Sequence, residues 1–329
     1  MNKTKVLITG ADGFIGEMLV NKFKVLPYYS LTLLTLTEYR SKSKKIRRIS
    51  ADLVSGRGLE KLRDWKFDLI VHTAGSTDTS KKDHRANDIG TKNLVESLNL
   101  IESSHFIYTS STAIFAGRRN CTSGINEDTS PRPTNEYGRT KLIAEEYLIR
   151  ASRLKKFKLT ILRLSTVHGK NTKKNGLFDT LSKDIKRNGM ISRINWPGYT
   201  SLVHVDDVCD AIILISEKPP KIGKFNCYNL YSDSWTMEHI SCFMHEALKI
   251  PYRAIVVPKV LWKISAKFRL FISYCEKLVP SEIYNYLWRF GLIVDDTLYC
   301  SSSNLSDKIP DWEPRKFYES VQDVVDIKV

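Results

Sequence analysis

The amino-acid sequence predicts an α/β protein built on a doubly wound parallel sheet. Apolar, strand-like runs alternate with amphipathic, helix-like segments over about the first 165 residues, and this alternation is typical of parallel strands joined by helical crossovers. Three glycines, Gly10, Gly13 and Gly16, stand directly between the first predicted strand and the first predicted helix. We expect residues 1–168 to form the main domain and residues 169–329 a smaller α/β region that is interleaved with it.

The strand-like runs are short and rich in Val, Ile and Leu, as expected of strands that are buried on both faces. They lie at residues 5–9, 31–36, 47–50, 67–73, 105–109 and 159–164. Apolar residues recur every three to four positions, which predicts helices, at residues 14–26, 86–101 and 136–152. After residue 168, turns rich in Gly and Asn interrupt the alternation. There we expect a strand followed by a helix at 201–216, aromatic helices near 259–278 and 281–290, and the substrate pocket.

The chain is basic, with a formal net charge of +15 from 51 Lys+Arg and 36 Asp+Glu. A positive charge suits nucleic acid, an anionic membrane surface or an anionic substrate, but no nucleic-acid-binding motif accompanies it, so we expect no nucleic-acid partner. The six cysteines are widely spaced, without CxxC or zinc-like His spacing, which predicts free thiols, no metal site and a reducing cytoplasm. No apolar stretch is long enough for a membrane span or a signal peptide.

The glycine pattern has the form of a phosphate cradle. The first glycine permits a tight turn, the second lets the backbone approach a pyrophosphate, and the third lets the helix pack closely on the strand. The N-terminus of the following helix then offers free N–H groups and a partial positive charge to phosphate. The sequence therefore predicts a Rossmann sheet that binds a dinucleotide through Gly10, Asp12, Gly13, Phe14, Ile15 and Gly16.

The choice between NAD and NADP is left open by the end of the second predicted strand. Thr37 stands where an acid accepts the ribose hydroxyls in NAD enzymes. Glu38, beside it, would favour NAD, whereas Arg40, with Lys42, would favour the 2′-phosphate of NADP. A solvated, charged loop is the alternative interpretation for each of these residues.

Tyr137 and Lys141 are spaced to lie one turn apart on the same face of the predicted helix. An ammonium there favours the phenolate, so Tyr137 is expected to exchange a proton near neutral pH, while Lys141 also holds the nicotinamide ribose. Upstream, the Ser/Thr-rich strand end at 108–112 offers a hydroxyl to an oxygen whose charge changes in hydride transfer. Ser/Thr clusters at strand ends usually only hydrogen-bond to backbone groups. Here the cluster stands between the glycine turn and the Tyr137/Lys141 pair, and this order favours a functional role.

Together these motifs resemble the extended short-chain dehydrogenase/reductase family, the NAD(P)-dependent nucleotide-sugar epimerases, dehydratases and 4-keto reductases. The resemblance extends over nearly the whole chain, including segments 162–169, 202–207 and 311–314. It implies a catalytic set of Tyr137, Lys141, Asn87 and a hydroxyl, which counting back from Gly117 places on Thr112, with Ser111 as the fallback. It also implies cofactor contacts at Asp52, Leu53, Thr73, Ala74 and Gly75, substrate contacts at Ser76, Thr112, His168 and Arg193, and a homodimer formed through helices 86–101 and 136–152.

Departures from the family pattern narrow the reaction. Ala113 and Ile114 stand where dehydratases of the family carry an Asp-Glu pair, and C3/C5 epimerases place a cysteine near Ala113. The resemblance therefore implies a C4 epimerase or a 4-keto reductase of a nucleotide sugar, an activity of polysaccharide biosynthesis. Thr200 stands where several members carry an arginine that clamps the nucleotide pyrophosphate. Arg193 or Arg289 would have to replace it.

A second functional hypothesis comes from residues 260–274, which mix aromatic and basic side chains. Such a segment can lie on an anionic membrane surface, although packing on the substrate domain with the lysines in water is the favoured interpretation. The membrane interpretation would fit a 3β-hydroxysteroid dehydrogenase-like enzyme that acts on a hydrophobic or lipid-linked substrate. A non-catalytic cofactor-binding protein is a third hypothesis, and the Tyr137/Lys141 pair argues against it.

Overall fold

The computed structural model describes residues 3–37, 46–77, 83–118, 123–172, 176–264, 290–291, 293–294, 298–301 and 305–325. Two of the candidate cofactor residues, Glu38 and Arg40, lie outside the described residues, as do residues 265–274 of the aromatic and basic segment and most of the helix expected at 281–290. Residues 259–264 are helical. Among the described residues, no helix is long and apolar enough to cross a membrane.

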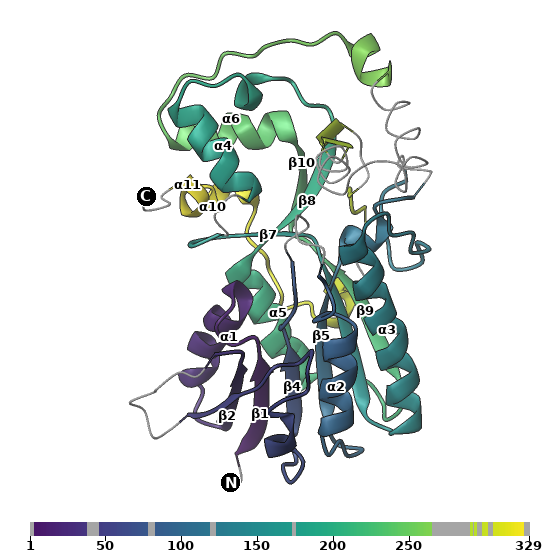
Figure 1. Cartoon of the computed structure of the whole chain (residues 1–329). Helices are drawn as coiled ribbons and strands as arrows, with labels where there is room; N and C mark the ends of the chain where they lie inside the picture. Colours follow the sequence, from purple (N-terminus) through teal and green to yellow (C-terminus); the bar gives the residue numbers. More distant parts are fainter. Residues whose placement is uncertain are drawn as a thin grey trace.

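The main body of the protein is a seven-stranded parallel sheet with the strand order β3-β2-β1-β4-β5-β6-β9 (Figure 1). Its strands are β1 Thr4–Thr9, β2 Tyr29–Thr35, β3 Arg47–Ser50, β4 Leu69–His72, β5 His105–Ser111, β6 Lys158–Leu164 and β9 Phe225–Leu230. The prediction of a doubly wound parallel sheet is confirmed, since the chain adds β2 and β3 on one side of β1 and the later strands on the other side. The edge strand β9 was not predicted.

Helices cover both faces of this sheet. They are α1 Phe14–Lys24, α2 Ile89–Ser97, α3 Glu136–Leu154 and α5 Val205–Glu217. Side chains of β1 alternate between the faces, because successive residues of a strand point in opposite directions. Val6 and Ile8 join a core with α1 and α5, whereas Leu7 joins a second core with α2 and α3. The apolar runs of the sequence are therefore buried on both sides.

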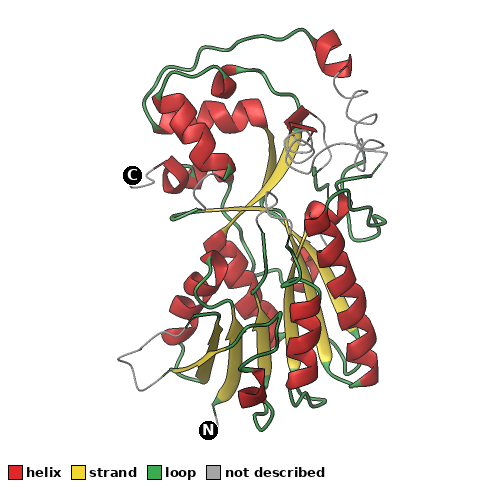
Figure 2. Cartoon of the chain, in the orientation of Figure 1, coloured by secondary structure: helices red, strands yellow, loops and turns green. Residues whose placement is uncertain are grey.

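A smaller sheet lies beyond the main one (Figure 2), in the order β10-β8-β7. Its strands are β7 Thr166–His168, β8 Tyr199–His204 and β10 Asp233–Thr236, and α4 Leu177–Lys186 and α6 Met237–Ala247 accompany them. The short helical segments are η1 Leu59–Leu62, η2 Thr112–Phe115, η3 Ile191–Arg193, α9 Leu305–Lys308, α10 Phe317–Ser320 and α11 Gln322–Val325. A smaller α/β part is thus confirmed. A boundary at residue 168 stays a prediction, because β7 precedes it and β9 returns to the large sheet.

Helix α2 is shorter than the helix expected at 86–101. The carboxylate of Asp88 accepts a hydrogen bond of 2.7 Å from the backbone N–H of Ile89 and caps the helix there. Residues 85–88 form turns instead. Asn87 therefore lies just outside the helix, where its side chain bonds the loop at Ser76.

Candidate active site

The glycine turn has the close contacts that a phosphate cradle requires. Gly10 has φ +66°, and a β-carbon there would lie 2.7 Å from the backbone of Ala74. A β-carbon on Gly16 would lie 2.0 Å from the carbonyl oxygen of Gly10. Helix α1 begins at Phe14, and Gly13, its N-cap, supplies no side chain to occupy the N–H groups of the first turn. The loop therefore fits a dinucleotide pyrophosphate.

Substituting Gly16 tests this cradle. In Gly16→Ala we expect dinucleotide binding to be lost and thermal stability to fall, because the new methyl group would collide with backbone that no side-chain rotation can move. Gly56→Ala is the matched control, since Gly56 also has a positive φ, +78°, but a β-carbon there meets nothing within 4 Å. Titration with NADH and NADPH checks both variants. Normal binding by Gly16→Ala would contradict the cradle.

The end of strand β4 lies between the glycine turn and helix α3. The hydroxyl of Thr73 donates to the carbonyl of Thr9 over 2.7 Å, and the backbone N–H of Ala74 donates to the Thr9 hydroxyl over 3.3 Å. A β-carbon on Gly75 would lie 2.6 Å from Oδ1 of Asn87 and 3.4 Å from Nζ of Lys141. The structure thus brings residues 73–75, predicted to bind the cofactor, together with two of the predicted catalytic residues.

Asn87 is fully buried and fastens the loop after β4 to helix α3. Its Oδ1 accepts from the backbone N–H of Ser76 over 2.9 Å, and its Nδ2 donates to the Ser76 carbonyl over 3.0 Å and to the Thr140 hydroxyl over 3.2 Å. Ser76, a predicted substrate contact, is therefore held beside the site by its backbone.

Phe14 and Ile15 lie in the first turn of α1, and four other predicted cofactor residues lie in the turns that follow β1, β2 and β3. The carboxylate of Asp52 accepts from the backbone N–H of Val54 over 2.9 Å and from the hydroxyl of Ser55 over 2.7 Å. These bonds, that from Ser55 most of all, lower the pKa of Asp52. Leu53 packs near Gly90 of α2, and the side chains of Asp12 and Thr37 are exposed.

Lys141 is buried, with 3% of its surface exposed. Its ammonium donates to the carbonyl of Thr109 over 2.8 Å and lies 4.8 Å from the centre of the Tyr108 ring. Burial lowers the pKa of Lys141 to about 8, and the nearby carboxylate of Glu145 opposes this shift. A lysine with such a pKa changes its charge readily when a neighbouring group gains or loses a proton.

Tyr137 lies in the first turn of α3, which Asn135 caps by accepting from the backbone N–H of Gly138 over 2.8 Å. Burial raises the pKa of the Tyr137 phenol, and a hydrogen bond with the Ser111 side chain opposes this. We expected Lys141 to lower this pKa. That direction is wrong for this structure, because removal of the phenol from water outweighs the other effects.

The two candidate hydroxyls at the end of β5 lie in different places. Ser111 is the last residue of the strand, is half-buried, caps η2 and hydrogen-bonds with Tyr137. Thr112 is the first residue of η2, is buried, and its hydroxyl donates to the carbonyl of Leu164 over 3.3 Å. The structure therefore brings Ser111, the fallback, to Tyr137 and turns Thr112 toward strand β6. The strand becomes a helical turn between these two residues, and the choice between the two hydroxyls stays a prediction.

A buried ion pair between β6 and α3 lies next to the end of β5. Arg163 of β6 donates to both carboxylate oxygens of Glu145 in α3, over 2.8 Å from Nη2 and 3.2 Å from Nε. The hydroxyl of Ser110 donates to the same carboxylate. Glu145 is 1% exposed and Arg163 is 9% exposed. One carboxylate thus joins β5, β6 and α3, the elements that carry Ser111, Tyr137 and Lys141.

His84, which no sequence motif indicated, also lies at the site. Its ring centre lies 5.7 Å from that of Tyr137, and its Nδ1 lies 3.2 Å from the carbonyl oxygen of Ser76. It is 2% exposed. The signal available in the sequence was a histidine three residues before Asn87, on the same stretch of chain.

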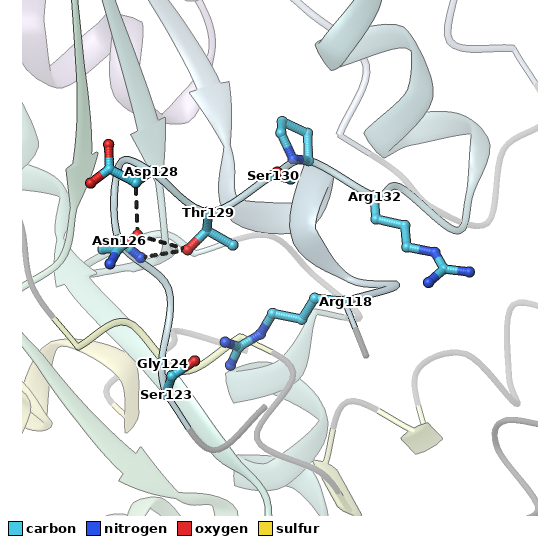
Figure 3. Close-up of a pocket in the computed structure, with 9 residues that line it drawn as sticks. Arg118, Ser123, Gly124, Asn126, Asp128, Thr129, Ser130 and Arg132 are labelled. Carbon is cyan, nitrogen blue, oxygen red and sulfur yellow. Dashed lines mark hydrogen bonds between the residues drawn. The ribbon is translucent and has the colours of Figure 1, made fainter. Parts of the chain in front are cut away.

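A cavity of about 580 Å³ follows η2 (Figure 3). Its loop is anchored to η2 by the backbone N–H of Arg132, which donates to the carbonyl of Ile114 over 2.7 Å. In Figure 3 the side chains of Arg118 and Arg132 extend in different directions. This cavity, which no sequence motif indicated, is lined by Arg118, Ser123, Gly124, Asn126, Asp128, Thr129, Ser130, Pro131 and Arg132.

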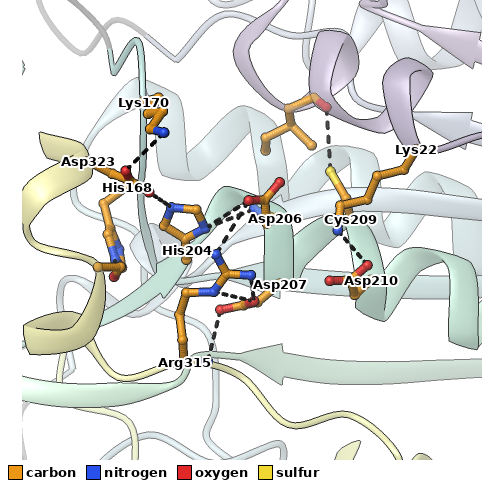
Figure 4. Close-up of polar contacts among 12 residues, drawn as sticks. Lys22, His168, Lys170, His204, Asp206, Asp207, Cys209, Asp210, Arg315 and Asp323 are labelled. Carbon is orange, nitrogen blue, oxygen red and sulfur yellow. Dashed lines mark hydrogen bonds and ion pairs between the residues drawn. The ribbon is translucent and has the colours of Figure 1, made fainter. Parts of the chain in front are cut away.

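Two predicted substrate residues lie elsewhere. His168 is fully buried, and its Nε2 lies 2.9 Å from the hydroxyl of Ser320. It belongs to a junction (Figure 4) where segment 202–207 holds the C-terminal segment. Here Arg315 donates to Asp207 over 3.0 Å, and His204 lies 3.1 Å from Asp323. The ring of His168 packs against those of Phe178, His204 and Phe317, and burial lowers its pKa to about 3 and keeps it neutral. A substrate contact at His168 stays a prediction.

Arg193 is likewise engaged away from the predicted site. Its Nε donates to the carbonyl of Arg253 over 2.9 Å. The hydroxyl of Thr200, at the position of the missing family arginine, lies 3.4 Å from that of Thr166. In the parts of the chain that the structure describes, no group of three or more His, Cys, Asp or Glu side chains is placed to bind a metal.

The fold and the site define a dinucleotide-binding α/β enzyme with a tyrosine and a lysine beside the cofactor cradle. A model of the NAD dependent epimerase/dehydratase family matches residues 6–230. The chain belongs to this family, and membership confirms the expected cofactor class, NAD or NADP.

Curated relatives share about a quarter of their residues with this chain. A putative UDP-glucose 4-epimerase from Methanocaldococcus jannaschii is 26% identical over 221 residues, which cover 64% of this chain and 72% of the relative. A dTDP-L-rhamnose 4-epimerase from Burkholderia thailandensis is 25% identical over 276 residues, covering 66% and 74%. The human dTDP-D-glucose 4,6-dehydratase is 28% identical over 182 residues, covering 50% and 51%.

Solved structures show the same fold over almost the full length. A UDP-glucose 4-epimerase from Thermotoga maritima, solved with UDP-glucose, superimposes with a TM-score of 0.74 at 18% identity, covering 98% of this chain and 97% of that one. A putative epimerase from Burkholderia cenocepacia has the same TM-score and identity and covers 99% and 98%. At this identity the likeness establishes the fold.

Proposed function

We propose that the protein is an NAD(P)-dependent C4 epimerase or 4-keto reductase of a nucleotide sugar. The observation that carries the proposal is that α3 places Lys141 next to Gly75 and, one turn earlier, Tyr137 against Ser111, at the same end of the sheet as the glycine cradle. The names of the relatives support the substrate class, since they include UDP-glucose and dTDP-L-rhamnose 4-epimerases.

Each side chain of the site has a separate role in the proposed reaction at the sugar C4 oxygen. A nicotinamide dinucleotide, when bound, supplies the reversible hydride acceptor. Tyr137 removes the proton of the 4-hydroxyl as the C4–H bond breaks, and returns a proton to the carbonyl oxygen when that bond forms again. Ser111 donates a hydrogen bond to the same oxygen and holds it in place. Lys141, next to Gly75, would hold the ribose of the bound dinucleotide, and Asn87 holds the loop at Ser76 beside it.

The neighbouring residues support chemistry at C4 alone. Ala113 and Ile114 are buried and apolar, so neither can remove a proton from C3 or C5 or donate one to a leaving hydroxyl. Elimination of water and inversion at C3 and C5 both require such groups. This favours simple C4 oxidation and reduction over 4,6-dehydration.

The proposal is tested with the purified full chain and a panel of UDP- and dTDP-hexoses and their 4-keto derivatives. We expect either a C4 epimer without net change in the cofactor, or consumption of a 4-keto sugar with oxidation of NADH or NADPH. Nuclear magnetic resonance of the sugar and absorbance of the reduced cofactor measure the two outcomes. Dinucleotide binding without turnover of any member, together with oxidation of a hydrophobic alcohol, would overturn the nucleotide-sugar assignment.

A further inference from the structure

A basic and apolar surface lies at the end of the large sheet opposite the site. Helix α3 carries Tyr137 in its first turn, at the site, and ends at Leu154, and its 19 residues extend about 28 Å. Figure 1 shows it running from near the smaller sheet to the far end of the large one. There β6 begins at Lys158 and β9 at Phe225, and the backbone N–H of Leu159 bonds the carbonyl of Lys224 over 3.3 Å.

A groove of about 410 Å³ opens at this end, between the end of α5, residues 218–224, β9 and α9. Four lysines line it, namely Lys218, Lys221, Lys224 and Lys308. Its floor is apolar, because Ile215, Tyr228 and Ile309, all buried, also line it. A groove with cationic walls and an apolar floor suits a ligand that is both anionic and apolar.

Among the described residues, one of the four groove lysines forms an ion pair. Lys218 lies 3.8 Å from a carboxylate oxygen of Asp311, whose side chain is 76% exposed, so water screens that pair. Within the described residues, Lys221, Lys224 and Lys308 form no ion pair. Ammonium groups gathered without partners attract anions from solution.

Large apolar side chains are exposed among these cations. Leu154 is 83% exposed, Ile222 is 48% exposed and Phe225 is 36% exposed. The guanidinium carbon of Arg153 lies 5.9 Å from the centre of the Phe225 ring, which joins the end of α3 to the start of β9. We call Arg153, Leu154, Lys221, Ile222, Lys224 and Phe225 the basal patch.

We propose that the basal patch docks the protein on an anionic lipid bilayer, with the lysines on lipid phosphates and the apolar side chains in the headgroup boundary. Each basic residue near an anionic leaflet contributes attraction, and exposed apolar residues beside it add burial. A nucleic acid would use the charge but leave Leu154 and Ile222 in water. Docked in this way, the protein points its cofactor cradle and its Ser111 and Tyr137 away from the membrane, toward water-soluble substrates.

Cosedimentation of the full chain with vesicles tests the proposal. We expect binding to vesicles of phosphatidylcholine with added phosphatidylglycerol, no binding to phosphatidylcholine alone, and weaker binding at high salt. Lys221→Glu/Lys224→Glu should weaken binding to the anionic vesicles at least about 25-fold, from about fivefold per lysine. Ile222→Ser should weaken it less and leave the salt dependence unchanged.

A matched control is Arg187→Glu/Lys249→Glu, which makes the same change in net charge at exposed positions after α4 and α6. It should alter vesicle binding by less than about threefold. Equal losses of vesicle binding in the two double variants would overturn the proposal, as would an absence of vesicle binding by the unaltered chain. Binding of a single-stranded oligonucleotide is measured in parallel. If Lys221→Glu/Lys224→Glu weakened oligonucleotide binding more than vesicle binding, the proposal would also be overturned. Retained binding of NADH or NADPH in every variant shows that folding and the cofactor site, on which the proposed reaction rests, are intact.

Discussion

Replacing Tyr137 with phenylalanine is expected to lower turnover at least about 10³-fold, because the phenol is the proposed group that exchanges the proton of the C4 oxygen. Dinucleotide binding should stay normal, since the ring remains packed against His84 and the glycine cradle is untouched. Stopped-flow or steady-state turnover of the identified sugar, with cofactor titration alongside, measures the two quantities separately. Unchanged turnover would remove Tyr137 from the mechanism.

The hydroxyl partner of Tyr137 can be identified by a matched pair of variants. Ser111→Ala should lower turnover on the order of 10²-fold, because it removes the hydrogen bond to the phenol and to the reacting oxygen. Thr112→Val keeps the shape of the side chain and loses only the bond to the carbonyl of Leu164, so turnover should change little. The reverse result would assign the role to Thr112, as the count along the sequence suggested.

The second large effect concerns stability. Glu145→Ala is expected to lower the free energy of unfolding by about 3–5 kcal/mol, because it leaves the buried guanidinium of Arg163 without a carboxylate. The loss should also lower the pKa of Lys141 further, since the carboxylate of Glu145 is what opposes the effect of burial. Denaturant unfolding measures the first effect.

The double variant Glu145→Leu/Arg163→Met provides the control for Glu145→Ala. Because it removes both charges and keeps apolar volume, it should be more stable than Glu145→Ala. A double variant as unstable as the single one would mean that lost packing, and not an unpaired charge, causes the effect. A loss below about 1 kcal/mol in Glu145→Ala would mean that water reaches Arg163.

The first half of the fold follows from local patterns in the sequence. Strand β3 has the predicted bounds, and α3 differs from its prediction by two residues, because the apolar periods are regular and the caps are clear. Strand β9 could not be predicted in this way. Its place in the large sheet depends on pairing Leu159 with Phe225, which are far apart in the chain, and residues 225–230 carry no signal that chooses between the two sheets.

In the candidate site, too, some positions follow from local sequence motifs and others depend on tertiary structure. Gly10, Asn87 and Lys141 lie together as their motifs predict, because motif spacing places them on strand ends and on one helix. The choice between Ser111 and Thr112 depends on where a strand turns into η2, and one residue of difference sends a side chain to the opposite side. His84 reaches Tyr137 through tertiary packing alone, so no spacing rule finds it.

The return of the chain to the large sheet at α5 and β9 limits how this protein can be divided. A fragment that ended after β6 would lack α5, whose Val208, Ile212 and Ile215 cover the same apolar face as Val6 and Ile8. It would also lack the strand that pairs with β6. The cofactor half is therefore not an independent module. Exchange of substrate specificity between relatives, by gene recombination or by design, has to proceed through replacement of loops within one continuous framework.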